Sequence, residues 1–430
     1  MTAAPVDLLY TDTERSLASA LDDILAARSG PAGVIARTEQ PETYDVALWK
    51  ALASDIGIGG LLIGEELGGA GASYRELAAA AERFGAYVAP VPYLGSAVVA
   101  TAAAIAALSS AASAATAGAS GPAPSGASAA ARMFSAARQR AAGESGASGS
   151  GAGTSLAAAG ADLLRRLADG TLTAALATPV DLAPGAPFPA DVRLSGTQAG
   201  DRDDGTFRLS GTIRSVADAL PADVLLVPAQ GVPNGLYLVE AGAAGVHRSP
   251  VTSLDMTRQL CDVSLDGAPA RQLAIGAAAA AAVEAGLAAG AVILAAEQLG
   301  LAQRCLDMTV AYVKERRQFA RPVGSFQGLK HRLADLWATI AQARAASRYA
   351  AACLAAGDPD TPVALALAKS ACCEASVTAA QECVQMHGGI GFTWEHPAHL
   401  YLKRAKAASV AFGTPGAHRA ALADLVNLPA

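Results

Sequence analysis

The hydrophobic period of this chain changes twice, and this limits the possible folds more than any other feature of the sequence. Up to about residue 108 the apolar residues recur at helical spacing. Between Leu172 and about Leu273 they alternate with polar residues in short runs, and after Ile275 the helical spacing returns in longer segments. The pattern predicts a multidomain α+β chain with a helical region at each end and a β-rich region between them.

The N-terminal region, residues 1–115, is predicted to be a helical domain. Its stretch GEELGGAGASYREL contains glycines that end one helix before another begins. Ser73 stands before that second helix and Glu76 follows three residues later, which is the spacing of a capping box.

Residues 116–160 differ in composition from the rest of the chain, because Ala, Ser and Gly dominate the segment. Such a segment buries too little apolar surface to offset the loss of chain entropy on folding. We therefore predict a flexible linker here.

The middle region, residues 161–275, is predicted to be a β domain. Short apolar runs are separated by Gly, Pro, Asp and Asn, namely LTAALAT, TFRLSGTIRSV, DVLLVPA, GLYLVEA and QLCDVSLDG. Such regular spacing is typical of a compact antiparallel barrel or sandwich.

The C-terminal region, residues 276–430, is predicted to be a four-helix bundle. Apolar faces at helical spacing indicate helices over about 277–313, 326–355, 362–387 and 397–411. The connections between them are short, so sequential helices are expected to pack antiparallel.

Composition excludes several classes of function. The formal net charge of −6 disfavours nucleic-acid binding. No run of about 18 bulky apolar residues indicates a membrane span, and the first residues lack the pattern of a signal peptide, so we expect a cytoplasmic protein. The six cysteines show neither CxxC pairing nor metal-ligand spacing, which predicts buried thiols and no metal site.

The first segment with a functional signal is KERRQFARPVGSFQGLKHRLADL, residues 314–336. Lys314, Arg316 and Arg317 fall in the last turn of a predicted helix. They could complement the negative end of that helix, or Arg316 could form a bidentate contact with a phosphate group. The residues alone leave both interpretations open.

The second segment is ECVQMHGGIGFTWEHPAHLYLKRAK, residues 382–406. Gly388, Gly389 and Gly391 follow a predicted helix, and a backbone without side chains lets an anionic ligand approach peptide N–H groups. A tight turn between two helices would explain the same glycines.

The two segments together, in this order within a C-terminal bundle, resemble the acyl-CoA dehydrogenase family. The resemblance extends to GLLIGEELGGAGASYREL and to the β-rich region, and covers nearly the whole chain outside residues 109–160. It implies helical, β and helical domains, with protomers associating through the C-terminal bundle. It also implies FAD, an acyl-CoA substrate dehydrogenated between Cα and Cβ, and an electron-transfer acceptor.

The resemblance also implies positions for the cofactor. Those expected at the adenosine diphosphate half of FAD are Arg316, Gln318, Phe319 and Gln327. Those expected at the pyrophosphate of an FAD held mainly by the neighbouring subunit are Gln385, Gly388 and Gly389.

The chain departs from the family where the reaction needs a base. The family uses a carboxylate to remove the α-proton while the flavin accepts the β-hydride. At the usual position, before a Gly-Thr pair, this chain has Phe412, and at the family's alternative position on the first bundle helix it has Gly290. Glu284 and Glu297 lie six and seven residues from Gly290, roughly 10 Å along a helix. We expect Glu284 to be a surface residue and Glu297 a packed, paired one, so no catalytic residue is assigned.

The usual contacts to the flavin ring are also reduced. Only Thr178 and Pro179 match the family's loop in the β domain. On the strand that usually offers a Trp and a Thr, this chain has Ser215 and Ala217. The motifs for the adenosine half are thus kept, whereas the base and the ring contacts are lost.

This division favours a base-lacking subunit of a heteromeric enzyme, an α2β2 tetramer. Subunits of actinobacterial heterotetrameric acyl-CoA dehydrogenases in sterol or fatty acid catabolism are similar in this respect. Two alternatives stay open: an active homo-oligomeric enzyme with a relocated base, and a structural family member that binds neither FAD nor CoA.

Overall fold

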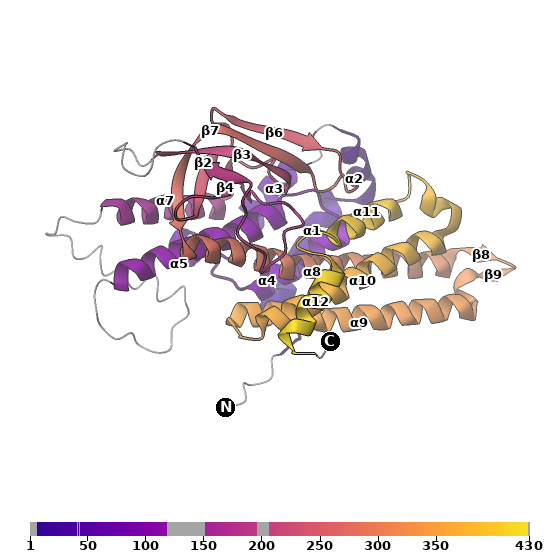
Figure 1. Cartoon of the computed structure of the whole chain (residues 1–430). Coiled ribbons are helices and arrows are strands. Elements are labelled where there is room, and N and C mark those ends of the chain that lie inside the picture. The colour runs from indigo at the N-terminus through magenta and orange to yellow at the C-terminus, as the bar shows by residue number, and fades with distance from the viewer. Residues whose placement is uncertain (1–6, 41, 43, 118–150, 196–205, 429–430) are drawn as a thin grey trace.

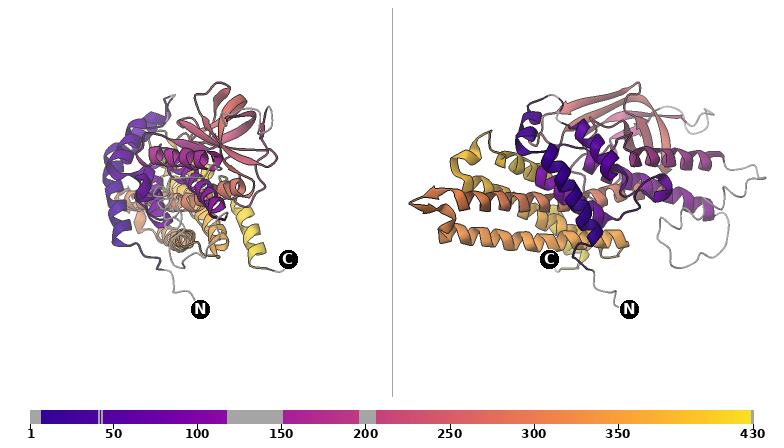
Figure 2. Two further views of the ribbon diagram at one scale, coloured as in Figure 1. Left: turned by 90° about the vertical axis from the view of Figure 1, so that its left-hand side faces the viewer. Right: turned by 180° about the vertical axis from the view of Figure 1, so that it is seen from behind.

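The order of helical, β-rich and helical regions that the periodicity predicts is confirmed. A computed structural model of the chain describes residues 7–40, 42, 44–117, 151–195 and 206–428. The β-sheet and the N-terminal helices lie beside the long helices of the C-terminal region (Figure 1). Viewed end-on, the three regions surround the central helix α8, Ala277–Glu315, which contacts all of them (Figure 2).

The N-terminal region contains mostly helices. They are α1 (Asp12–Arg28), α2 (Pro31–Thr38), α3 (Val46–Ala51), α4 (Tyr74–Tyr87), the π-helix η4 (Tyr93–Ala100) and α5 (Thr101–Ala117). Ser73 and Glu76 form the predicted capping box at the start of α4, where the Ser73 N–H donates to Glu76 Oε2 at 2.9 Å. The short distance from Ser73 to Glu76 in sequence made this feature predictable.

Helix α7, Gly151–Ala168, begins inside the segment predicted as a linker and continues into the segment assigned to the β domain. Its apolar residues Leu163, Leu164 and Leu167 are buried at helical spacing. The helix packs on α5, and a Cβ on Gly160 would lie 2.6 Å from the Leu108 side chain. The part of the predicted linker at 118–150 lies outside the described residues.

The β region is one seven-stranded sheet in the order β1-β4-β5-β7-β3-β2, with β6 paired to β7. Its strands are β1 (Ala174–Leu176), β2 (Val192–Leu194), β3 (Thr206–Ala217), β4 (Val224–Ala229), β5 (Gly235–Glu240), β6 (Val246–Val251) and β7 (Leu260–Ile275). The five predicted runs all contain strands, whereas β2 and β6 were not predicted.

The prediction of an antiparallel barrel or sandwich is wrong in two respects. β1 pairs with β4 in parallel, so the sheet is mixed. Parallel neighbours need a long crossover connection, and here it includes β2 and β3. The sheet also does not close into a barrel: among the described residues, a single isolated bridge, Arg193 to Gln230, links β2 to the residue after β4.

Both faces of the central strands are buried, which accounts for the apolar run DVLLVPA. On β4, Leu226 belongs to the core shared with the helices, whereas Leu225 and Val227 belong to a second core within the curved sheet. Successive side chains of a strand point to opposite faces. The sheet therefore packs on the helices through one face and around its own core through the other.

The C-terminal region contains the four predicted helices and one more. These are α8, α9 (Gln327–Ala356), α10 (Thr361–His387), α11 (Ala398–Ala408) and α12 (Pro415–Leu425). Thr414 caps α12, which was not predicted, by accepting from the Ala417 N–H at 3.2 Å. The two-residue strands β8 (Arg317–Gln318) and β9 (Arg321–Pro322) form a hairpin after α8 at the tip of the molecule (Figure 1).

In the described part of the chain, three helical segments are long and apolar enough to cross a bilayer by length and composition, a feature the sequence analysis did not recognise. They are Tyr93–Ser110, Ala277–Glu315 and Thr361–Phe392. In the protein 72%, 61% and 67% of their most apolar windows are buried. Packing inside the core accounts for this apolar character, since these helices form the centre of the molecule.

Candidate functional site

A pocket lies where the N-terminal, β and C-terminal regions meet. Its wall combines residues of η4, of the loop after β1, of the end of β3 and of the segment after α11, including Leu94, Val99, Thr178, Ala217, Asp218 and Phe412. The loop ATPV, the strand end IRSVADA and the Phe412 position are far apart in sequence. The structure brings them together, as the resemblance implied.

The two positions where the family places its base converge on one point of this pocket. A Cβ built on Gly290 would lie 2.6 Å from Cζ of Phe412 and 2.9 Å from Cγ2 of Val99. The ring of Phe412 therefore occupies the space into which a side chain at residue 290 would project. Neither position supplies a carboxylate, and a side chain at residue 290 would require this ring to move.

The backbone of Phe412 is held on both sides. Its N–H donates to the Val180 carbonyl at 2.8 Å, and the Val180 N–H donates to the Ser215 carbonyl at 3.1 Å. The carbonyl of Phe412 accepts from Nε2 of His418 at 2.8 Å. These bonds fix a left-handed backbone with φ 54° at Phe412, a conformation that costs free energy for a residue other than glycine.

Asp218 is a carboxylate of the pocket wall that the sequence analysis missed, although it follows Ala217 directly. Oδ1 accepts from the Tyr44 hydroxyl and Oδ2 accepts from the Gly95 N–H at 2.8 Å. Burial raises the pKa of Asp218, and the nearby Arg258 guanidinium opposes that rise. Both oxygens are occupied, so Asp218 ties the end of β3 to the N-terminal region.

A buried ionic network lies behind the pocket. Glu297 accepts from Arg258 at 2.6 Å and from Arg404 at 2.8 Å, and Arg404 also contacts Asp255 at 3.2 Å. Burial alone would raise the pKa of Glu297, but the two guanidinium groups lower it to about 2. Glu297 is thus the packed, paired residue that was expected, because both of its carboxylate oxygens form ion pairs with buried guanidinium groups.

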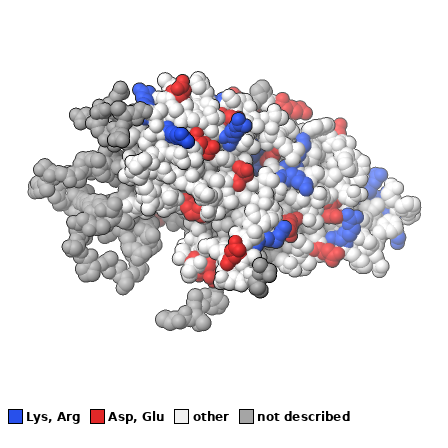
Figure 3. Space-filling view, viewed as in Figure 1, with Lys and Arg blue, Asp and Glu red and all other residues white. Residues whose placement is uncertain are grey.

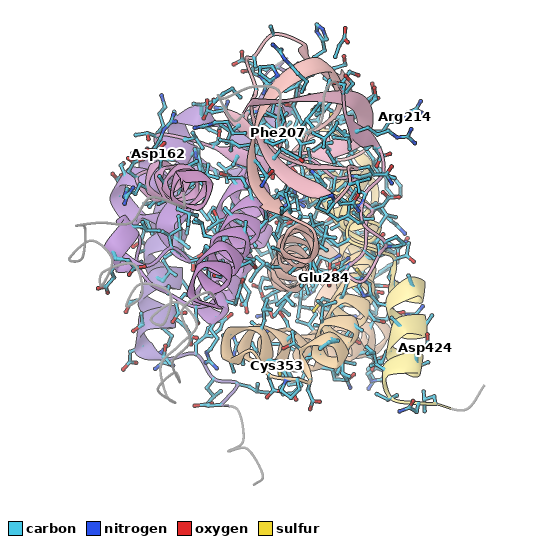
Figure 4. All side chains as sticks on the ribbon, turned by 60° about the vertical axis from the view of Figure 1, so that its left-hand side comes forward. Asp162, Phe207, Arg214, Glu284, Cys353 and Asp424 are labelled. Carbon is cyan, nitrogen blue, oxygen red and sulfur yellow. The ribbon has the colours of Figure 1, made fainter. Side chains whose placement is uncertain are left out.

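Glu284 has the expected surface position on α8 (Figure 4). Its Oε2 accepts from the Gly185 N–H at 2.8 Å, which joins α8 to the loop after β1. It is exposed and is not among the residues of the pocket wall.

The predicted cofactor residues gather at the opposite end of the bundle, where α8 and α10 end and α9 begins. The exposed ones are Arg316, Gln318, Phe319, Gln327, Gln385, Gly388 and Gly389. Arg332 of α9 and Glu382 of α10 form an ion pair at 2.6 Å, which fastens two of these helix ends together. The two segments identified in the sequence are therefore neighbours in space.

At two glycine positions at this end of the bundle, neither the backbone conformation nor the packing within the chain requires a glycine. Gly328, in the first turn of α9, and Gly389, in the turn after α10, have no atom within 4 Å of an added Cβ. Neither has a left-handed backbone, in contrast to Gly388 with φ 63°. Glycine in a helix costs stability, so its presence at Gly328 fits a site that something outside the chain approaches.

Charge does not single out one large surface. Basic and acidic side chains are interspersed over the face seen in Figure 3. An anion must therefore be met by local groups, among which Lys314, Arg316, Arg317 and Arg321 are all exposed. All six cysteines are buried and free, as expected. Among the described residues no cluster of His, Cys, Asp or Glu could hold a metal ion.

Comparison with known proteins identifies this architecture. The family models for the N-terminal and C-terminal domains of acyl-CoA dehydrogenases match residues 11–117 and 279–426. The acyl-CoA dehydrogenase IpdE2 of Mycobacterium tuberculosis is 31% identical over 404 residues, covering 94% of each chain.

Two solved structures share the fold over nearly the whole chain. A chain of the ChsE4–ChsE5 complex from Mycobacterium tuberculosis is 26% identical with a TM-score of 0.74, covering 99% of this chain and 100% of that one. A chain of the Tcur3481–Tcur3483 steroid ACAD is 28% identical with a TM-score of 0.72, covering 97% and 98%. The protein belongs to the acyl-CoA dehydrogenase family, a family of flavoprotein oxidoreductases.

Proposed function

We propose that this chain is the base-lacking subunit of a hetero-oligomeric acyl-CoA dehydrogenase. A second subunit of the same family supplies the carboxylate that removes the α-proton, and the two chains share FAD. The observation that carries the proposal is the position of the Phe412 ring. The ring fills the space in which a carboxylate at residue 412 or at residue 290 would lie. A chain with that place filled by an apolar ring has no general base for this proton.

The partner is argued from the similar structures. Two solved relatives are named as pairs of different chains, the ChsE4–ChsE5 complex and the Tcur3481–Tcur3483 steroid ACAD. This chain matches a single chain of each at 26% and 28% identity over nearly its full length. We infer the same arrangement here, with a sterol- or fatty-acid-derived acyl-CoA thioester as substrate in the cytoplasm and a separate electron acceptor.

FAD fits the bundle end better than the pocket. Helix α9 starts without a side-chain cap, so its first N–H groups are available to an anion, and Gly328 leaves the approach open. Arg316 and Gln327 would hold the adenosine diphosphate half, and Gln385, with the turn at Gly388, would hold the pyrophosphate. Bound FAD supplies the acceptor for the β-hydride.

The alternative of an active homo-oligomer with a relocated base is less well supported. Asp218 is the acidic residue of the pocket wall, and both of its oxygens already accept hydrogen bonds from Tyr44 and Gly95. Taking a proton from substrate would require Asp218 to give up one of these bonds.

The test is purification of the chain alone and together with candidate family partners. Alone it should carry little FAD and should not oxidise acyl-CoA, whereas the correct pair should contain flavin and turn over. Flavin per protomer and acyl-CoA-dependent dye reduction measure both properties. Stoichiometric flavin with sustained turnover from the lone chain would refute the proposal.

A further inference from the structure

An aromatic stack connects the two segments assigned to FAD. The ring of Tyr312, in the last turn of α8, stacks on His387 with 4.4 Å between centroids and 30° between planes. The ring of His396, from the turn after α10, also contacts His387, with 4.3 Å between centroids and a tilt of 46° between planes. Three rings from three positions in the sequence therefore form one continuous group.

His387 is held in place at the centre of this stack. Its side chain is almost fully buried, with 4% exposed. Nδ1 donates to the carbonyl of Cys383, one turn earlier in α10, at 2.6 Å. This bond holds the imidazole ring against the last turn of its own helix.

Two members of the stack, Tyr312 and His387, are close in sequence to the residues assigned to the cofactor. The carbonyl of Tyr312 accepts from the backbone N–H of Arg316 at 2.9 Å, so Tyr312 fixes the residue at the end of α8. His387 immediately precedes Gly388, where the backbone leaves α10 with φ 63°. The ring contact between Tyr312 and His387 therefore joins the chain just before Arg316 to the chain just before Gly388.

We propose that the Tyr312–His387–His396 stack is a positioning element that holds the Arg316 segment and the Gly388 turn in one arrangement, so that both contact the same pyrophosphate-containing ligand. This inference rests on the proposed function, because it assumes that both segments contact one FAD. Tyr312 and His387 are assigned a positioning role and no direct contact with the cofactor.

A positioning element is needed here because the residues assigned to the cofactor come from the ends of separate helices. Helix ends are the least restrained parts of a helix, since several backbone groups there lack partners. A stacked aromatic pair contributes about 0.5–1.5 kcal/mol beyond its buried area. That energy links α8 and α10 at their ends, where the ion pair between Arg332 and Glu382 links α9 and α10.

The experiment is a double-mutant cycle in the complex of this chain with its second subunit. FAD is titrated into the apo complex of the wild type, Tyr312→Leu, His387→Leu and the double variant. Each single Leu variant should weaken FAD binding about two- to tenfold. The double variant should be no weaker than the worse single variant, because either change already breaks the stack.

Conservative variants separate positioning from a general loss of folding. Tyr312→Phe and His387→Phe keep a ring in the stack and should retain FAD binding close to wild type. His399→Leu is the matched control, since this ring stands edge-on to Trp394 and outside the stack. It should leave FAD binding unchanged.

The results that would overturn the positioning role differ from those that would overturn the proposed function. Strictly additive losses in the double variant, or equal losses with Phe and Leu, would overturn the positioning role. Normal FAD binding in both Leu variants, with weakened binding in Arg316→Ala, would also overturn it while leaving the proposed function intact. Normal binding in Arg316→Ala as well would overturn the FAD assignment on which this inference rests.

Discussion

The pocket around Phe412 and the bundle end around Arg316 differ in the contacts that their side chains make. At the pocket, Phe412, Asp218 and Glu297 are buried and bonded to other residues of the same chain. At the bundle end, Arg316 is exposed and forms no ion pair within the described part of the chain. Phe319 is 85% exposed.

This difference indicates that the two parts now serve different roles. Exposed large aromatic residues next to a basic residue are suited to contact with another molecule. Buried polar groups that are fully paired contribute to the fold of the chain itself and offer nothing to a ligand. Changes at the pocket should therefore affect stability, whereas changes at the bundle end should affect flavin binding.

The largest effect is expected for Glu297→Gln. The change leaves buried Arg258 with a neutral partner and buried Arg404 with Asp255 alone, which should lower the free energy of unfolding by about 3–5 kcal/mol. Urea denaturation at neutral pH measures it. A loss below about 1 kcal/mol would contradict the importance of this network.

The same residue predicts an acid dependence. The pKa of Glu297 is lowered to about 2 in the folded protein, against about 4.3 in the unfolded chain. Its contribution to stability is therefore fully present above about pH 4.3 and is lost as the pH falls towards about 2. Glu297→Gln should lose part of this acid dependence, which denaturation curves between these pH values would show.

The next largest effect is expected on FAD binding, with little change in the stability of the fold. Arg316→Ala should weaken FAD binding to the assembled complex by about 1.5–3 kcal/mol, because it removes a charge-assisted contact to a phosphate. Arg317→Ala, one residue on in β8, is the control and should retain flavin. If Arg316 only caps α8, flavin content will not change and stability will fall by about 0.3–1 kcal/mol.

A smaller effect is expected at the point where the two base positions meet. Gly290→Ala places a Cβ against the Phe412 ring, and such overpacking costs about 1–3 kcal/mol. Adding Gly290→Ala to Phe412→Ala should cost less, since the opposing ring is gone and only the contact with Val99 remains. Equal costs of Gly290→Ala in both backgrounds would show that Phe412 does not occupy this space.

The smallest effect is expected for Glu284→Gln. The residue is on the surface of α8, so the free energy of unfolding should change by no more than about 0.5 kcal/mol. Turnover of the assembled complex should not change either. A large loss of turnover would instead favour Glu284 as a relocated base.

The sequence alone determined the elements whose signals are local. The helices of the bundle, the Ser73 capping box and the five predicted strand runs follow from periodicities and turn residues that span a few positions. Helical hydrogen bonds join residues four positions apart, and successive side chains of a strand alternate between its two faces, so both periods can be recognised without the fold. The absence of a carboxylate at Phe412 and Gly290 was also visible in the sequence.

Only the tertiary structure decided which distant residues meet. The contact of Phe412 with Gly290, the bonds of Asp218 to Tyr44 and Gly95, and the stack of Tyr312 on His387 join positions that no periodicity relates. The parallel pairing of β1 with β4 has the same origin. Such contacts depend on how whole helices and strands pack, because close packing selects among many arrangements that local propensity leaves equally favourable.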